Sequence, residues 1–363
     1  MKIVVTGLRG FPDIQGGIET HCEELYPRIA SRGVDVTVVR RTCFVKENPP
    51  LTEYKGVKFK DINTPKIIGL EAALHTLVSV FYAKRVHADI IHIHAVGPSI
   101  VVPVAKLLRL KVVVTHHGPD YDRKKWGRFA KFILKSGERF TAKYADRIIV
   151  ISTVIRDILK NKYNRTQGVE LIYNGVNVYP RATSTDFLQS LHIHPGRYIV
   201  AVGRFVEEKN FDQLITAYEQ LKKQTDCQLV LVGDADIETA YSKNIKHTAK
   251  EKGVILTGIV KGEKLKELYS YAALFVLPSS HEGLPITLLE AMSYDRKVVV
   301  SDIPANLAVN LPTECYFHCN DLKDMQEKIE RQLNLPTKDY HYDLTPYNWD
   351  HIADQTISVY RSV

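Results

Sequence analysis

The sequence predicts an α/β fold of two doubly wound units, each a parallel β-sheet with helices on both faces. The chain has 363 residues, about twice the length of an ordinary domain. Short β-branched runs that are apolar on both faces alternate with helix-length amphipathic segments, which is typical of a buried parallel sheet. The alternation fades near residue 177 and restarts near residue 198. We therefore expect two domains of the same class, one after the other.

The first half carries six predicted strands. Its first crossover helix runs from Glu19 to Arg32 and ends at Gly33, because glycine readily closes a helix. The expected strands are residues 2–7, 35–39, 89–94, 111–115, 146–151 and 169–173. These elements place the first domain at residues 1–180.

The second half repeats this pattern. The stretch 177–196 is rich in Pro, Ser, Thr and Asp, so we place the boundary there and the second domain at residues 181–345. A last helix is expected from Trp349 to about Arg361, within residues 346–363. Doubly wound sheets bind ligands at the carboxyl ends of their strands, so we expect a ligand in a central cleft between facing units. The five expected strands are residues 198–203, 228–233, 254–258, 273–278 and 297–302.

The composition indicates a globular protein of a reducing compartment. Hydrophobic residues make up 45% and charged residues 25% of the chain, enough for two cores. The sequence has no apolar run long enough to span a membrane, and its amino terminus enters a strand without a secretory signal pattern. The five cysteines are scattered and lack a C-x-x-C pair, which argues against disulfides and structural zinc. A cytoplasmic location is predicted.

Charge is distributed unevenly along the chain. Residues 1–180 contain 29 Lys and Arg against 16 Asp and Glu, a net +13, whereas residues 181–363 contain 20 against 25, a net −5. A basic half beside an acidic half indicates that the first half faces an anionic partner.

Residues 121–145 hold eight Lys and Arg against two acids, with aromatic residues among them at helical spacing. This pattern predicts a basic amphipathic helix that docks on an anionic membrane, which would place the protein at the inner face of the plasma membrane. One alternative is an ordinary crossover helix with one solvated face. The other is a nucleic-acid surface, but the chain has no recognised nucleic-acid-binding module, so we expect no nucleic-acid partner.

The strongest motif follows a predicted strand of the second half. Glu282 and Glu290 are eight residues apart, and the segment Gly283-Leu284-Pro285 stands before an apolar helix. A loop that enters a helix presents free backbone N–H groups and the positive end of the helix dipole, which suits a phosphate. We expect the two carboxylates to face one groove and bind hydroxyl groups. The alternative, a solvated pair of surface acids, is disfavoured by the buried strand just upstream.

A second motif lies at the end of another predicted strand. This strand ends in Gly203, and Arg204 and Lys209 lie in the turn before the next helix, near Asn210 as its N-cap. Two cations at the carboxyl end of a strand suit a diphosphate, because together they offset its charge. The alternative is a pair of surface cations beside the acids that lie between them.

The loop after the first strand is rich in glycine but lacks the G-x-G-x-x-G pattern of dinucleotide sites. Gly16 and Gly17 stand just before the first helix. The missing side chains there allow backbone amides to approach a phosphate.

Histidines gather near two predicted strand ends, at His92, His94, His116 and His117. They lack an Asp or Glu at a spacing that suits a metal, so no metal is predicted. His117 is expected at the interdomain cleft, and Asp120 in the same segment is expected to bind substrate.

Together these motifs resemble the family-4 retaining glycosyltransferases, which have the GT-B fold of two Rossmann-like domains. The resemblance covers essentially the whole chain. Residues 9–33 and 113–126 look like a bacterial subgroup, the rhamnosyltransferases of capsule, O-antigen or exopolysaccharide assembly. The motifs that carry the resemblance occur in the same order as in the family. They are Gly16-Gly17, T-x-H-G at 115–118, YNGV at 173–176, Arg204 with Lys209, Glu282 with Glu290, and W-x-x-I-A-x-Q-T at 349–356.

The resemblance implies four catalytic residues. Arg204 and Lys209 would neutralise the donor diphosphate as it leaves. Glu282 would bind sugar hydroxyls, and His117 would contact the transferred sugar near the reacting carbon. Gly17 would approach the diphosphate, Glu290 would bind the ribose, and the base would lie near residues 259–262. The implied substrate-binding set is Gly16, Gly17, Asp120, Ile259, Val260, Gly283, Leu284, Pro285 and Glu290.

The implied reaction is retaining transfer of a sugar to a lipid-linked saccharide in cell-surface polysaccharide synthesis. Subgroup resemblance favours dTDP-L-rhamnose as donor, with UDP- and GDP-hexoses behind it. No cofactor or metal is expected, because two cations already meet the diphosphate. The terminal helix is expected to cross back onto the first domain. Two alternatives stay open: a nucleotide-sugar epimerase on the same fold, and a non-catalytic nucleotide-sugar-binding protein.

Overall fold

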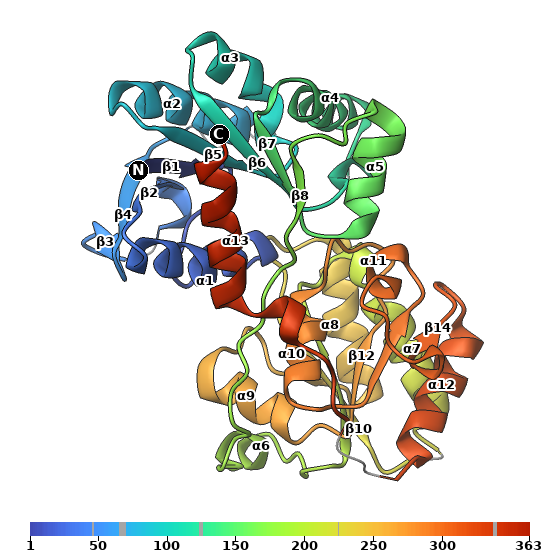
Figure 1. Cartoon of the computed structure of the whole chain (residues 1–363). Coiled ribbons are helices and arrows are strands. Elements are labelled where there is room, and N and C mark those ends of the chain that lie inside the picture. The colour runs from blue at the N-terminus through green and yellow to red at the C-terminus, as the bar shows by residue number, and fades with distance from the viewer. Residues whose placement is uncertain (46, 65–69, 123–125, 224, 337–339) are drawn as a thin grey trace. The chain divides into compact units, whose positions relative to one another are not determined.

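The computed structural model describes residues 1–45, 47–64, 70–122, 126–223, 225–336 and 340–363 (Figure 1). They form two compact units: the first unit comprises Met1–Gly175 with Tyr347–Val363, and the second comprises Val176–Pro346. Each unit has its own sheet and its own hydrophobic core. The first unit is therefore built from both ends of the chain.

The first unit contains an eight-stranded sheet of order β3-β4-β2-β1-β5-β6-β7-β8, parallel except for the β3–β4 pair. Strand β1 lies between β2 and β5, so the direction of winding changes there. Ligands of doubly wound sheets bind at such a switch point. The strands are β1 (Lys2–Thr6), β2 (Asp35–Arg41), β3 (Glu53–Tyr54), β4 (Val57–Ile62), β5 (Ile90–His94), β6 (Lys111–His116), β7 (Arg147–Val150) and β8 (Val169–Leu171).

The helices of the first unit are α1 (Gly17–Ser31), α2 (Leu70–Arg85), α3 (Val102–Leu107), α4 (Arg128–Tyr144), α5 (Thr153–Tyr163) and α13 (Trp349–Arg361). Helix α1 ends just before Gly33, whose φ of 83° suits the left-handed turn that closes a helix. Among the described residues, no helix has both the length and the apolar character that a membrane crossing requires.

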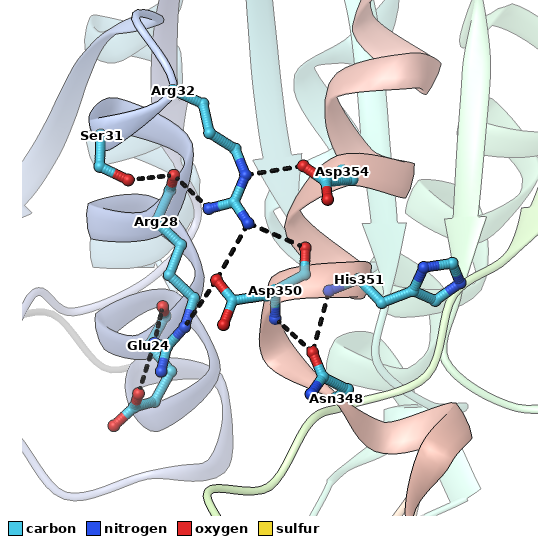
Figure 2. Close-up of polar contacts among 8 residues, drawn as sticks. All are labelled: Glu24, Arg28, Ser31, Arg32, Asn348, Asp350, His351 and Asp354. Carbon is cyan, nitrogen blue, oxygen red and sulfur yellow. Dashed lines mark hydrogen bonds and ion pairs between the residues drawn. The ribbon is translucent and has the colours of Figure 1, made fainter.

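Helix α13 packs against α1 and joins the end of the chain to the first unit (Figure 2). Arg32, the residue that follows α1, binds Asp350 (Nη2–Oδ1 2.9 Å) and Asp354 (Nε–Oδ1 2.6 Å) of α13. Trp349 is buried against Gly175, where a Cβ atom would come within 2.3 Å of the indole ring. Glycine is thus required at position 175 for the tryptophan to dock.

The second unit contains a six-stranded parallel sheet of order β11-β10-β9-β12-β13-β14. Strand β9 lies between β10 and β12, which makes it the switch point of this sheet. The strands are β9 (Tyr198–Val202), β10 (Gln228–Val232), β11 (Ile255–Leu256), β12 (Leu274–Leu277), β13 (Val298–Ser301) and β14 (Tyr316–Phe317). The helices are α6 (Asp186–Ser190), α7 (Phe211–Leu221), α8 (Ala240–Lys252), α9 (Gly262–Ser270), α10 (Ile286–Ser293), α11 (Pro304–Leu307) and α12 (Leu322–Asn334).

Two sequence-based expectations are corrected by the structure. The helix expected over residues 121–145 starts later: a 3₁₀ turn, η3 (Asp120–Asp122), comes first and α4 begins at Arg128. Lys124 and Lys125 lie outside the described residues. The sequence argument also missed β3, β4 and β14, because β3 and β4 form an edge hairpin with alternating exposure and β14 has two residues.

Candidate active site

The predicted site residues of the second unit follow adjacent strands. The loops after β9, β10 and β12 carry Arg204, Asp236 and Glu282 in turn. The first two strand ends approach each other backbone to backbone: a Cβ on Gly233, which has a φ of +131°, would lie 2.0 Å from the Gly203 carbonyl oxygen. Charged side chains from three loops are therefore gathered at the switch point of this sheet.

Both predicted phosphate cations are held in ion pairs. Lys209 Nζ lies 2.5 Å from Glu282 Oε1, with side-chain exposures of 16% and 13%. Arg204 Nη1 lies 2.9 Å from Asp236 Oδ2, with exposures of 24% and 27%. These side chains are more buried than those of ordinary surface ion pairs. A charge at this depth would cost desolvation energy if it had no partner, so each pair is expected to stay formed. Each cation is thereby fixed in place at the edge of the sheet.

Helix α10 begins at Ile286 with Pro285 at its N-cap and, in the described chain, has no side-chain hydrogen bond at this cap. Leu284 is buried beside it. Glu290, in the second turn, accepts a hydrogen bond from the Tyr269 hydroxyl at 2.8 Å. Burial, followed by the nearby Glu290 carboxylate, raises the pKa of Tyr269 well above its usual range. Tyr269 therefore stays protonated and orients this carboxylate.

The remaining predicted residues of the second unit lie near β11. Ile259 and Val260 follow this strand and precede α9, and Ile259 is 54% exposed. Gly283 is half-buried in the loop before α10.

In the first unit, Gly16 and Gly17 mark the start of α1. Gly16 has a φ of 152°, and a Cβ there would lie 2.0 Å from Glu19 Oε2. A Cβ on Gly17 would meet no atom within 4 Å. No side chain of the described residues caps this helix. The space beside Gly17 and the amides of the first turn suit an anionic group.

The four histidines expected to cluster divide into two groups. His116 is fully buried away from the others: its Nε2 lies 3.1 Å from Glu138 Oε1, and its Nδ1 accepts from the Gly118 amide. Burial alone would raise the pKa of Glu138, but hydrogen bonds from His116, Lys162 and Tyr163 outweigh it and lower the pKa to about 2. This carboxylate on α4 thus holds the loop that carries His117.

His92, His94 and His117 form the other group, which His21 of α1 joins. The rings of His94 and His117 stack, with His94 Nδ1 at 2.8 Å from His117 Nε2. His117 is half-buried at the end of β6. Burial, followed by His21 and the neighbouring histidines, lowers the pKa of His117 well below its usual range. At neutral pH its ring is therefore uncharged and can meet a neutral sugar.

Asp120 is half-buried in the 3₁₀ turn η3, where its amide donates to the Gly118 carbonyl at 2.9 Å. Among the predicted residues, the structure brings Lys209 into contact with Glu282 and His94 into contact with His117. Sequence reasoning missed His21, Asp236 and Tyr269. Asp236 follows β10 as Arg204 follows β9, so a search of every strand end would have found it, whereas nothing local marks His21 or Tyr269.

A groove of about 430 Å³ lies elsewhere in the first unit, between β8 and α13. Its lining includes Glu170, His351 and Gln355 but none of the predicted site residues. We therefore assign it no part in the site.

Two family models match consecutive parts of the chain. Residues 15–179 match the model described as Glycosyltransferase Family 4, and residues 184–348 match the model described as Glycosyl transferases group 1. Together they span both domains.

Curated relatives share about a quarter of their residues with the chain. An uncharacterized glycosyltransferase of Methanocaldococcus jannaschii is 23% identical, with 99% of this chain and 98% of the relative covered. The alpha-maltose-1-phosphate synthase of Mycobacterium tuberculosis is 26% identical, with 97% of each covered. An Escherichia coli UDP-Gal:alpha-D-GlcNAc-diphosphoundecaprenol alpha-1,3-galactosyltransferase is 26% identical, with 72% of this chain and 71% of the relative covered.

Solved structures share the fold. Sucrose-phosphate synthase from Thermosynechococcus elongatus superposes with a TM-score of 0.83 at 21% identity, covering 99% of this chain and 98% of its own. Anabaena HepE in complex with UDP-glucose superposes with a TM-score of 0.82 at 18% identity, and the match covers 100% of each chain.

Proposed function

Because the chain belongs to the family-4 glycosyltransferases of the GT-B fold, we propose that it is a retaining enzyme that moves a hexose from a nucleotide-sugar to a lipid-linked saccharide. The observation that carries this proposal is the pairing of Lys209 with Glu282 beside the ends of β9 and β12. One group suits a diphosphate and the other suits sugar hydroxyls, and these are the two parts that a nucleotide-sugar joins.

The names of relatives support both substrates. The name of the E. coli relative specifies UDP-galactose as donor and a sugar on diphosphoundecaprenol as acceptor. HepE was solved with UDP-glucose. For this chain the resemblance to the rhamnosyltransferase subgroup favours dTDP-L-rhamnose, followed by UDP- and GDP-hexoses.

Donor binding exchanges ion pairs at the strand ends. The diphosphate takes Lys209 from Glu282 and Arg204 from Asp236, so two positive charges meet the leaving group. Glu282 is then available to accept hydrogen bonds from sugar hydroxyls. Because both cations already contact the bound diphosphate, little reorganisation is needed when negative charge develops on it as it leaves.

Transfer with retention proceeds on one face of the sugar. The bond between the anomeric carbon and the diphosphate oxygen breaks while the acceptor hydroxyl attacks that carbon. The diphosphate oxygen then takes the proton of the acceptor hydroxyl. Arg204 and Lys209 stabilise the departing charge. Uncharged His117 accepts or donates a hydrogen bond at the sugar, and Glu290, held by Tyr269, binds the hydroxyl of the nucleotide's pentose, which in a dTDP-sugar is the 3′ hydroxyl.

A thermal-shift screen tests the donor class. Of dTDP, UDP, GDP and ADP, we expect dTDP to raise the melting temperature most, because a ligand that binds the folded state alone stabilises it. The Glu290→Gln variant should show a smaller shift with the same nucleotide, since its contact to the hydroxyl of the nucleotide's pentose (the 3′ hydroxyl in dTDP) is weakened. No shift with any of the four would contradict the proposal that the chain binds a nucleotide-sugar.

We expect transfer to continue in excess EDTA, because Arg204 and Lys209 supply the positive charge that a divalent ion provides in other transferases. The measurement is the rate of sugar transfer before and after chelation. A complete loss that added Mg²⁺ or Mn²⁺ restores would contradict this assignment.

A lipid-linked acceptor is also supported by the surface of the first unit. Helices α2, α3 and α4 contact one another in succession and lie next to each other in Figure 1. Of the eight large hydrophobic side chains exposed in the described part of this unit, six are on these helices: Val78, Phe81, Leu107, Phe129, Phe132 and Tyr144. Exposed apolar side chains at this frequency on neighbouring helices suit a contact surface.

Helix α4 gives this surface a positive charge. Phe129 and Phe132 are 78% and 66% exposed, and the one acid of this helix, Glu138, is fully buried. Trp126, which lies just before this helix, is partly buried and packs against a small buried cluster. Exposed cations and aromatic side chains together suit an anionic bilayer. The exposed cations of α4 are Arg128, Lys135, Arg139 and Lys143.

A further inference from the structure

Three histidines from three elements of the first unit meet at the switch point of its sheet. His21 comes from α1, His94 ends β5 and His117 follows β6. Each histidine offers one ring nitrogen, and these three nitrogens all lie within 4.8 Å of one another. No metal is predicted from the sequence, because the strand-end histidines lack an acidic partner there, and His21 is not among those histidines.

His21 is difficult to explain as a packing residue. It is 3% exposed, and neither ring nitrogen makes a hydrogen bond of normal geometry in the described chain, although Asn174 lies near enough to favour its charged form. A buried imidazole whose nitrogens make no hydrogen bond of normal geometry costs free energy that a phenyl ring would not. Its ring makes edge contacts with Trp349 and His117 and a tilted contact with His94, all of which phenylalanine could also make. A role for its nitrogen explains why a histidine is present.

His94 has the outer support that metal-binding histidines need. Its Nδ1 points toward His117, while its Nε2 lies 2.5 Å from the Tyr26 hydroxyl. Tyr26 in turn contacts His92, which contacts the Tyr360 hydroxyl at 2.7 Å. Partners of this kind on the second ring nitrogen fix the tautomer and orientation of a ligand.

The three imidazoles are also in the protonation state that a metal requires. Burial lowers the pKa of His21 to about 4, and burial with neighbouring histidines lowers the pKa of His94 and of His117 well below the usual range. At neutral pH each ring therefore offers a lone pair.

We propose that His21, His94 and His117 bind one divalent ion of the zinc class. Three imidazoles without a carboxylate favour Zn²⁺ over Mg²⁺ or Mn²⁺, and a three-histidine set leaves a fourth position open. Imidazole nitrogens around Zn²⁺ stand ~3.4 Å apart. The His94 and His117 nitrogens, now 2.8 Å apart, therefore separate slightly, and His21 approaches by about an ångström. The proton between His94 and His117 moves to the other nitrogen of its ring, so all three imidazoles stay neutral when the ion binds.

One consequence rests on the proposed function. His117 is assigned there to the transferred sugar, so an ion bound to its ring competes with the donor sugar. Zn²⁺ is then an inhibitor rather than a cofactor, which is consistent with the prediction that transfer continues in EDTA.

Binding is tested on the full chain with any affinity tag removed, by titration with Co²⁺ and Zn²⁺. We expect one ion per chain, a visible Co²⁺ absorption band of tetrahedral intensity, and displacement of Co²⁺ by Zn²⁺. His21→Phe should weaken binding about a hundredfold or more, because loss of a direct ligand costs at least as much as loss of an outer partner. The matched control is His247→Phe, which removes an exposed histidine of α8.

Melting curves establish that both variants fold. Absence of a 1:1 complex in the wild type, or equal weakening by His21→Phe and His247→Phe, would overturn the site. The inhibition is read separately: the residual activity of His21→Phe should resist Zn²⁺ concentrations that stop the wild type. Stoichiometric binding without inhibition would leave the metal site standing and would contradict the placement of His117 at the sugar.

Discussion

Replacing Arg204 or Lys209 with alanine should lower the transfer rate about a hundredfold or more while the protein still folds. Loss of one preorganised charge contact to a leaving group costs ~3 kcal/mol in the transition state. Lys209 should show the larger effect of the two, because its partner Glu282 is a site residue whose orientation depends on the pair. The measurement is steady-state turnover with the donor that the thermal-shift screen identifies.

Two controls separate charge stabilisation from folding. Lys243→Ala removes an exposed cation of α8, 4.0 Å from Glu238, and should leave turnover unchanged. Asp236→Asn removes the partner of Arg204 but keeps the guanidinium, so its effect should be smaller than that of Arg204→Ala. Turnover close to that of the wild type in both alanine variants would contradict the diphosphate assignment.

Replacing Lys135, Arg139 and Lys143 together with serine should weaken sedimentation with anionic vesicles about a hundredfold. Each cation near such a surface contributes about 1 kcal/mol. These side chains are exposed on the outer face of α4. Wild-type binding should also decrease as salt rises, because the attraction is screened over about a Debye length. Phe129→Ser with Phe132→Ser should weaken the salt-independent part of binding.

The matched control removes three exposed lysines from the second unit, Lys243, Lys250 and Lys323. It changes net charge by the same amount and should bind vesicles as the wild type does. If the wild type does not sediment with anionic vesicles even at low salt, α4 is an ordinary crossover helix. The acceptor would then be soluble, as a small sugar phosphate is.

The fold was largely predictable because its strands carry an unambiguous pattern. Strands such as β12, whose four residues are all apolar and buried, form continuous apolar runs in the sequence, and each expected strand forms within two residues of its expected bounds. Strand β4 was missed because its charged residues alternate with apolar ones, as befits a strand near the edge of the sheet. The start of α4 was misplaced because the basic residues continue at helical spacing upstream of Gly127, where the backbone turns out of the helix.

The candidate site was predictable where chemistry follows directly on a strand. Arg204, Lys209 and Glu282 stand in such loops, and the structure adds that the last two form an ion pair. The partners that come from elsewhere in the chain were not predictable. Tyr269 reaches Glu290 from α9, and His21 reaches His117 from α1, and both contacts depend on packing between elements that no local pattern encodes.

The central claim, retaining transfer from a nucleotide-sugar, is tested most directly by proton NMR of the purified protein with its preferred donor and water as acceptor. The account predicts release of the nucleoside diphosphate, with the first-formed free sugar in the anomeric configuration of the donor. Arg204→Ala should suppress that release. A sugar of inverted configuration, a donor isomerised without release of its nucleotide, or a donor bound and left unchanged would each contradict the account.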